Sequence, residues 1–240
     1  MLKYEYEPES SATNSVYMGS VSRSRGVNDK KLDNSISRTR SRVFEIAICN
    51  EWDYFVTMTI DGDKLARDDL QGYRKKLSKF LNNYNGEHNI RIAYLLIPEL
   101  HQDGINYHIH GLLSGLPLEH LTKFSTTDKL PRKIIAMQKM GRDIYTWSAY
   151  SSRFGYITLE KIIDSERCAF YITKYIKKGI AGTSAKVGLN YHLYYCSQNL
   201  NRAAVEYQGE LSQPLNPDYE NEYIAIKTLH SRDEAMSYFY

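Results

Sequence analysis

The middle of the chain carries apolar and polar residues in two periods, one typical of strands and the other typical of helices. Residues 54–60 alternate with period two, which places Thr57 and Thr59 on one face of a strand and apolar side chains on the other. Similar runs predict further strands at residues 90–97, 107–113, 154–159 and 192–196. Pro98 ends the strand at 90–97, and a turn at Asp103-Gly104 favours an antiparallel hairpin with the strand that follows.

Helical spacing of apolar residues predicts helices over residues 34–50, 65–84 and 165–178. Asn85-Gly86 breaks the second helix, Ser165 is the expected N-cap of the third, and Gly179 follows its last residue. Residues 117–150 show no clear period. The order of elements predicts an α+β fold, in which a central antiparallel sheet carries helices packed mainly on one face.

Composition divides the 240 residues into three parts. Residues 1–33 predict a flexible basic and polar arm, residues 34–208 form the folded domain, and residues 209–240 form an acidic C-terminal tail. The first residues lack the apolar segment of a signal peptide, and no run approaches the roughly 18 apolar residues of a membrane helix. Three widely spaced cysteines suit a reducing compartment, so we expect a cytoplasmic protein without a membrane partner.

Positive charge is concentrated in two segments, although the formal net charge is only +3. Arg38, Arg40 and Arg42 lie in a basic segment at residues 21–42, and Lys177 lies in a second one at residues 171–186. Such clusters indicate a local site for a polyanion, and solvated surface faces are the alternative interpretation.

Two histidines in the predicted strand at 107–113 are candidate metal ligands. His108 and His110 are two residues apart, so both imidazoles point to the same face, while Ile109 points to the core. Imidazole is a common metal ligand, and a carboxylate is the usual third donor. Glu99 follows the preceding strand and faces the histidines if the two strands pair. His101 lies in the turn, where we expect at most a supporting role.

The predicted helix at 165–178 presents two phenols and two ammonium groups on one face. Tyr171, Lys174, Tyr175 and Lys178 follow the spacing of one helical stripe, and apolar residues form a second stripe that can pack on a sheet. A tyrosine can attack a phosphodiester and hold one DNA end covalently. Because the ordinary pKa of a phenol is near 10, this chemistry needs a cation to stabilise the charge that develops.

Taken in order, these motifs resemble those of the HUH endonuclease superfamily, and more narrowly the rolling-circle replication initiation proteins of small phages, plasmids and single-stranded DNA viruses. A hydrophobic strand with threonines is matched by residues 55–59, and His-hydrophobic-His is matched by residues 108–110. Tyr-x-x-Lys is matched by residues 171–174, and Tyr175 adds the second tyrosine of the two-tyrosine phage and plasmid type. The stretch from Glu99 to Gly104 resembles the one that precedes the histidine pair in the initiation proteins of plant viruses, where an acidic residue often completes the metal site. The gap between Glu99 and His108 is one residue longer than in that pattern.

The resemblance implies a sheet of RNA-recognition-motif or ferredoxin-like type and a site that uses Mg²⁺ or Mn²⁺. It implies that a tyrosine nicks single-stranded DNA at a replication origin through a 5′-phosphotyrosine, and that Thr57 and Thr59 contact the DNA. Two tyrosines would allow alternating cleavage and religation. No phosphate-binding loop of an ATP-driven motor occurs in the chain, so a helicase and a polymerase of a bacterial host would be partners.

Two other interpretations stay open at the level of sequence. One is a single-stranded nucleic-acid-binding module without catalysis, which would suit the many aromatic residues and the basic segment. The other is an HUH transposase or relaxase. Relaxases place their tyrosine near the N-terminus, whereas the tyrosines here follow the histidines.

Overall fold

The computed structural model describes residues 24–101, 103, 105–125, 130–181, 192–198, 200–220 and 225–240, without the side chains of 24–33, 133, 177–181 and 219. The chain divides into two compact units. One unit comprises residues 46–201, and the other comprises residues 1–45 with residues 202–240. The candidate functional residues of the sheet and of the tyrosine helix all belong to the first unit, which we call the sheet unit.

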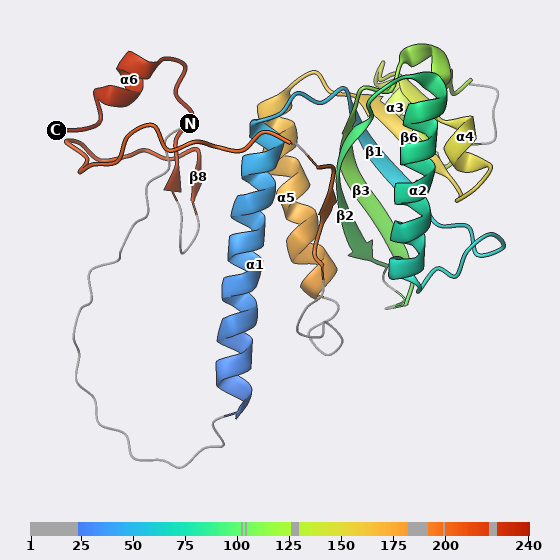
Figure 1. Ribbon diagram of the computed structural model, residues 1–240, viewed down its shortest axis with the longest axis horizontal. Helices are drawn as coiled ribbons and strands as arrows, with labels where there is room; N and C mark the ends of the chain where they lie inside the picture. Colours follow the sequence, from blue (N-terminus) through green and yellow to red (C-terminus); the bar gives the residue numbers. More distant parts are fainter. Residues whose placement is uncertain are drawn as a thin grey trace. The chain divides into compact units, whose positions relative to one another are not determined.

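A single antiparallel sheet organises the sheet unit (Figure 1). In the described residues its strands follow the order β4-β5-β6-β1-β3-β2-β7, so the strand with the histidines is flanked on both sides. The strands are β1 (Tyr54–Thr59), β2 (Ala93–Leu100), β3 (Tyr107–Ser114), β4 (Thr122–Lys123), β5 (Ile144–Thr146), β6 (Ile157–Lys161) and β7 (Tyr195–Cys196). The predicted hairpin of β2 and β3 and the predicted antiparallel sheet are confirmed.

Helices lie on both sides of this sheet, with α2 on one side and α5 on the other (Figure 1). The helices of the sheet unit are α2 (Leu70–His88), η1 (Leu118–His120), α3 (Arg132–Lys139), α4 (Ser148–Ser151) and α5 (Ser165–Ala181). The α+β class is therefore confirmed, and the arrangement is consistent with a ferredoxin-like fold. The prediction placed the helices mainly on one face, whereas α5 packs on the other face over β2 (Figure 1).

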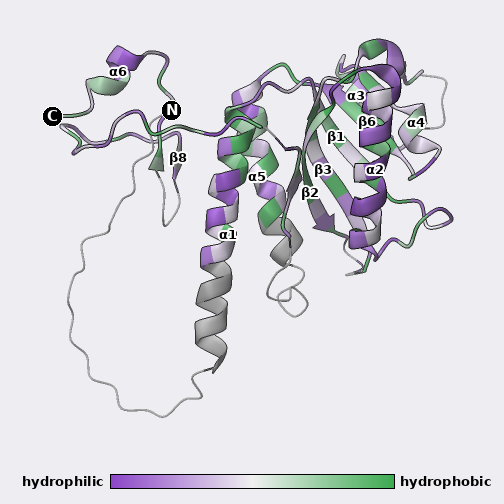
Figure 2. Ribbon diagram, viewed as in Figure 1, coloured by the Kyte–Doolittle hydropathy of each residue, from purple (hydrophilic) through white to green (hydrophobic). Residues whose placement is uncertain are grey.

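The main core lies between α2 and the sheet. Val56 and Met58 of β1 and Ile109 and Leu113 of β3 are buried there, on the face opposite the threonines and histidines. Figure 2 shows that the outer side of α2 is largely hydrophilic. The residues that α2 buries recur at helical spacing: Leu70, Tyr73, Leu77, Phe80, Leu81 and Tyr84. The period-two pattern of β1 thus fixes which face becomes the core and which face remains for function.

The predicted bounds of α2 were wrong at both ends. The helix begins at Leu70 because Asp69 caps it, with its carboxylate accepting a hydrogen bond from the Gly72 N–H at 2.8 Å. It then continues through Gly86, which a helix tolerates at a modest cost, and ends where Asn89 takes a left-handed conformation with φ of 52°.

The prediction that Pro98 ends its strand was also wrong, and this matters for the site. β2 continues to Leu100, and Pro98 pairs with Ile109 of β3. On its other side β2 pairs with β7 only at Leu95 and Leu96, so the missing N–H of the proline lies on an edge where no ladder bond needs it. Glu99 consequently belongs to the strand and lies opposite His108.

Two further boundaries differ from the sequence prediction. Asp164, not Ser165, caps α5, because its side chain accepts a hydrogen bond from the Arg167 N–H at 2.9 Å. The helix runs to Ala181 and so passes the predicted end at Lys178. β6 starts three residues later than predicted, after Gly155, whose φ of 142° is a conformation that L side chains rarely adopt.

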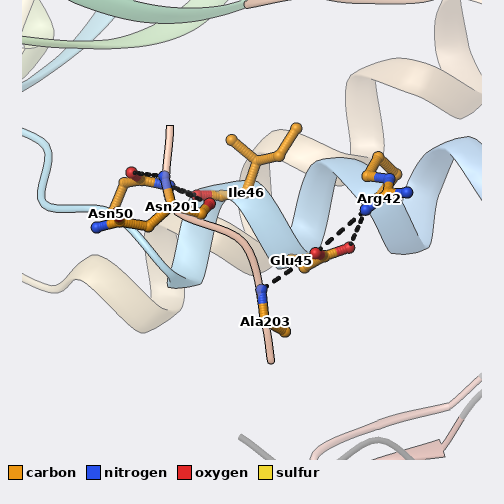
Figure 3. A network of polar contacts seen from close by, with 6 residues as sticks. All are labelled: Arg42, Glu45, Ile46, Asn50, Asn201 and Ala203. Carbon is orange, nitrogen blue, oxygen red and sulfur yellow. Dashed lines mark hydrogen bonds and ion pairs between the residues drawn. The ribbon is translucent and has the colours of Figure 1, made fainter. Parts of the chain in front are cut away.

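The ends of the sheet unit are joined by a reciprocal pair of hydrogen bonds (Figure 3). The side chain of Asn50 donates to the carbonyl of Asn201 at 3.0 Å, and the Asn201 N–H donates back to the Asn50 side chain at 2.8 Å. Asn50 also donates to the carbonyl of Ile46 at 2.8 Å. One asparagine therefore closes the end of the preceding helix and fixes the chain that leaves the unit.

The second unit contains most of α1 (Ser24–Ile48), β8 (Tyr219–Glu220), β9 (Ala225–Ile226) and α6 (Arg232–Met236). α1 begins at Ser24, within the segment predicted to be a flexible arm. Near its end Glu45 binds the guanidinium of Arg42 at 2.9 Å and accepts a hydrogen bond from the Ala203 N–H at 3.2 Å (Figure 3). The C-terminal segment holds itself together through a bridge between Leu211 and Phe239.

Alanine substitutions at two glycines of the sheet unit are expected to change the stability of the fold in opposite directions. A Cβ on Gly111 would lie 2.6 Å from the backbone oxygen of Leu95, so we expect Gly111→Ala to destabilise the fold by about 2 kcal/mol. For a chain of this size that lowers Tm by roughly 4–8 °C. Gly86 lies inside α2 with nothing within 4 Å of an added Cβ, so Gly86→Ala should stabilise by up to about 1 kcal/mol. Thermal unfolding of both variants checks the pair, and an unchanged Tm for Gly111→Ala would contradict the described packing of β2 on β3.

Candidate functional site

The two histidines of β3 are held by the two threonines of β1. The register pairs Thr57 with His110 and Thr59 with His108. The Thr57 hydroxyl lies 3.2 Å from Nδ1 of His110, and the Thr59 hydroxyl lies 3.3 Å from Nδ1 of His108. Because each Nδ1 has a hydroxyl partner, Nε2 is the nitrogen that each ring offers to other groups. The threonines thus orient both imidazoles.

Glu99 joins the histidines from the other neighbouring strand. It pairs with His108 in the register of β2 and β3, and its Oε2 lies 2.8 Å from Nε2 of His110. The side chains of Glu99 and His110 are 22% and 11% exposed, so this contact is shielded from bulk water but open on one side. The structure therefore brings Glu99 into contact with His110 and places it opposite His108.

Two imidazoles and a carboxylate form a donor set that suits a divalent cation and leaves positions for other ligands. Within the described part of the chain, no three His, Cys, Asp or Glu side chains already stand in a metal-binding arrangement. The Glu99 carboxylate instead contacts His110 itself, at 2.8 Å. The imidazole nitrogen and the carboxylate oxygen of this contact are both natural ligands for a cation.

His101 lies beside the site, as the turn before β3 places it. Its ring centroid is 4.9 Å from that of His108. Burial lowers the pKa of His108 below its ordinary value, and the nearby His101 lowers it further. The neutral ring is the form of imidazole that binds a metal. Asp103, 3.5 Å from His101, has its pKa lowered to about 2, mainly by the backbone N–H groups of Asn106 and Ile105.

Helix α5 brings the two tyrosines to the histidines. The ring of Tyr175 stacks on that of His110, with centroids 3.9 Å apart and planes 20° from parallel. Its hydroxyl donates a hydrogen bond to the hydroxyl of Tyr171 at 2.9 Å. The Lys174 ammonium lies 5.5 Å from the centroid of the Tyr171 ring. Tyr175 of the helical stripe predicted from the sequence therefore lies against the histidine strand, with Tyr171 beside it.

The two tyrosines differ in exposure, which the sequence did not predict. Tyr175 is 6% exposed, whereas Tyr171 is 43% exposed. Burial raises the pKa of Tyr175 far above its ordinary value, and the hydrogen bond to Tyr171 and the charge of Glu99 raise it further. Tyr175 thus keeps its proton and acts as the hydrogen-bond donor to Tyr171, whose side chain is exposed.

Phe55 is a part of the site that sequence reasoning passed over. Its ring stacks on His110 with centroids 6.3 Å apart and contacts Tyr171 edge-on at 5.5 Å and Tyr175 at 6.2 Å. The signal was available, because Phe55 shares the face of Thr57 in a strand of period two. Phe55 fills the space between the tyrosine helix and the sheet and so fixes their separation.

The remaining predicted residues fall elsewhere. The side chains of Lys177 and Lys178 lie outside the described residues, although their backbone belongs to α5. Arg38, Arg40 and Arg42 belong to α1 in the second unit. There Arg42 is engaged by Glu45, and Nε of Arg38 donates to the carbonyl of Asn34 at 3.3 Å. Their part in binding a polyanion stays a prediction.

None of the described helices has both the length and the apolar character needed to cross a membrane.

Comparison with known proteins places the sheet unit in a family. No curated protein and no solved structure matches the chain. Residues 53–180, more than half of the chain, match the model of a family of replication-associated proteins that includes ORF2. The matched segment runs from β1 into α5 and contains the threonines, Glu99, both histidines and both tyrosines. The chain therefore belongs to this ORF2 family of replication-associated proteins.

Proposed function

We propose that this chain is a nuclease of the HUH type that initiates rolling-circle replication by nicking single-stranded DNA at an origin. One observation carries the proposal: the Tyr175 ring stacks directly on His110, which joins the tyrosine helix to the candidate metal ligands. The same contact brings Tyr171, which bonds to Tyr175, and its neighbour Lys174 to the side of the sheet that carries Glu99 and His110. A nucleic-acid-binding module without chemistry has no need for this convergence.

The exposed phenol of Tyr171 is the proposed nucleophile. Its oxygen attacks the scissile phosphorus, the bond from phosphorus to the 3′ oxygen breaks, and a 5′-phosphotyrosine forms. The phenol loses one proton and the 3′ oxygen takes one up, so the step is balanced and its reverse religates the strand. Tyr175 donates its hydrogen bond to the Tyr171 oxygen and stabilises negative charge there, and the Lys174 ammonium adds a positive charge.

Glu99, His108 and His110 are the residues proposed to hold Mg²⁺ or Mn²⁺. Their chemistry fits such an ion, since the Thr57 and Thr59 hydroxyls engage Nδ1 and direct Nε2 of each ring toward a ligand position. When bound, the ion supplies a Lewis acid for a phosphate oxygen. The rings of Phe55 and Tyr175 contact the Tyr171 ring and would exclude part of the water around a phosphate bound there.

The second tyrosine suggests a second cleavage by the same chemistry. After one round of synthesis a second cleavage is needed to release the new strand, and Tyr175 lies one helical turn from the covalent link that Tyr171 would carry. For Tyr175 to act, its buried hydroxyl must become exposed. Unwinding and synthesis would require a helicase and a polymerase from the host cell.

A covalent adduct is the decisive test of this function. The full chain is incubated with labelled single-stranded oligonucleotides that tile the origin region of its own replicon, in Mn²⁺ or in excess EDTA, and run on a denaturing gel. We expect a labelled band at the mass of protein plus DNA in Mn²⁺, and a fall of about 10³-fold or more in its rate of formation in EDTA. Strands that bind without forming an adduct would identify a binding module, and an adduct of full yield in EDTA would remove the metal from the proposal.

A further inference from the structure

The face that carries the threonines and histidines continues beyond β1 onto β6. The register pairs Thr57 with Thr158, and the Thr59 N–H donates to the carbonyl of Tyr156 at 2.8 Å. Since Thr57 and Thr59 contact the two histidines, the side chains of Thr158 and Tyr156 share the face of the candidate site. Tyr156 and Thr158 lie one strand farther from the histidines than the threonines of β1.

The two halves of this face differ in access. On the β2 side Leu95 and Ile97, which have the same orientation as Glu99, are fully buried, and α5 packs over that half. On the β6 side Thr158 is only half-buried, and Tyr156 is 38% exposed. A strand held at the tyrosine site therefore has an accessible path over β1 and β6.

An aromatic pair lies on that path. The rings of Tyr156 and Phe124 stack with centroids 5.8 Å apart and planes 27° from parallel. Phe124 is fixed to the sheet edge, because its N–H donates to the carbonyl of Ile144 at 3.0 Å and its own carbonyl accepts from the Gln138 side chain at 2.9 Å. Two elements far apart in sequence thus hold one aromatic platform, which we call the Tyr156 platform.

The carboxylate that shares the face of the platform is paired with a cation. Glu160 shares this face through its pairing with Phe55, and a carboxylate there would repel phosphate. Arg142 forms an ion pair with Glu160 and neutralises it. What remains is a strip of threonine hydroxyls and aromatic rings. Aromatic rings on an open antiparallel sheet are the usual surface on which proteins stack the bases of single strands.

We propose that the Tyr156 platform binds a base of the single-stranded DNA substrate a few nucleotides from the scissile phosphate, an inference that rests on the proposed function. Neighbouring strands lie about 4.8 Å apart, so β6 is roughly 10 Å from β3. At about 3.4 Å per stacked base, the base on the platform lies about three nucleotides from the phosphate. The platform positions the strand and takes no part in the chemistry.

The test separates base stacking from phosphate binding. Fluorescence anisotropy measures the Kd of the full chain for a labelled mixed-sequence single strand and for a strand of equal length in which all bases are replaced by abasic sites. EDTA is present, so no cleavage occurs. We expect Tyr156→Ala to weaken binding of the base-bearing strand on the order of 10-fold and to leave the abasic strand within about twofold. Tyr156→Phe keeps the ring and should bind both strands as the wild type does.

Tyr207 offers a matched control. It is 40% exposed and contacts Phe239 with ring centroids 4.9 Å apart, so it is a second exposed aromatic pair, in the other unit. Tyr207→Ala should leave both affinities unchanged. The platform is overturned if Tyr156→Ala, with an unchanged Tm, binds the base-bearing strand as tightly as the wild type, which would assign the surface to a protein partner instead. It is also overturned if both strands weaken equally. Because the measurement needs no cleavage, failure to form an adduct and failure of the platform are distinguishable.

Discussion

Tyr171→Phe will remove the covalent protein–DNA adduct, whereas Tyr175→Phe will slow its formation without removing it. The reason is the difference in exposure between two residues one turn apart on α5. Tyr171 is 43% exposed, so we expect a phosphate to reach its hydroxyl. The Tyr175 hydroxyl belongs to a side chain that is 6% exposed and stacked on His110, and it already donates to Tyr171.

The expected sizes follow from these roles. Loss of the nucleophile in Tyr171→Phe should lower the single-turnover rate of cleavage by at least about 10³-fold. Tyr175→Phe keeps the ring on His110 and removes one hydrogen bond to the attacking oxygen, which should lower the rate roughly 3- to 10-fold. The double variant should form no adduct. Gel quantification gives the rates, and mass spectrometry of the peptide linked to DNA identifies the residue that carries it.

Tyr207→Phe is the matched control, because this tyrosine of the second unit is exposed to a similar extent and lies outside the site. Its cleavage rate should equal that of the wild type. The assignment is wrong if Tyr171→Phe forms the adduct at the wild-type rate with the DNA linked to Tyr175. In that case the buried tyrosine attacks first, and α5 must move before the reaction.

The face on which the site lies could be predicted from the sequence, but the burial of each of its residues could not. Period two in β1 and β3 puts Thr57, Thr59, His108 and His110 on one face, and the structure pairs each threonine with a histidine. Spacing on α5 likewise put both tyrosines on one stripe. Which of the two is buried depends on where the helix crosses the sheet, and a local pattern holds no information about that crossing.

Other errors have local causes. The prediction ended β2 at Pro98, because a proline removes a ladder hydrogen bond, but the pairing of β7 stops at Leu96 and leaves that position on an edge. Glu99 was predicted to face the histidines and does so from within the strand. The segment 117–150 resisted prediction because most of its elements are too short to show a period: β4, β5 and α4 have two, three and four residues, and α3 has eight.

The second large effect is expected at the metal ligands. His108→Ala should reduce adduct formation to the level seen in EDTA, because a donor of the proposed ion is lost, while binding of single-stranded DNA should change by no more than about twofold. Thr59→Val keeps the shape of the threonine but removes the hydroxyl 3.3 Å from Nδ1 of His108. Loss of such a supporting hydrogen bond typically weakens metal affinity by about 10- to 100-fold.

The two variants are separated by a titration with Mn²⁺. Calorimetry gives the affinity for the ion, and adduct formation at rising Mn²⁺ gives the concentration for half-maximal rate. For Thr59→Val both values should shift together by about 10- to 100-fold, and saturating Mn²⁺ should restore the rate, since the ligand itself is intact. For His108→Ala saturation should not restore it. Thr228→Val in the second unit is the control and should titrate as the wild type does. If Thr59→Val titrates like this control, the threonine does not orient His108 for a metal, and the paired hydroxyls of β1 contribute only to sheet packing.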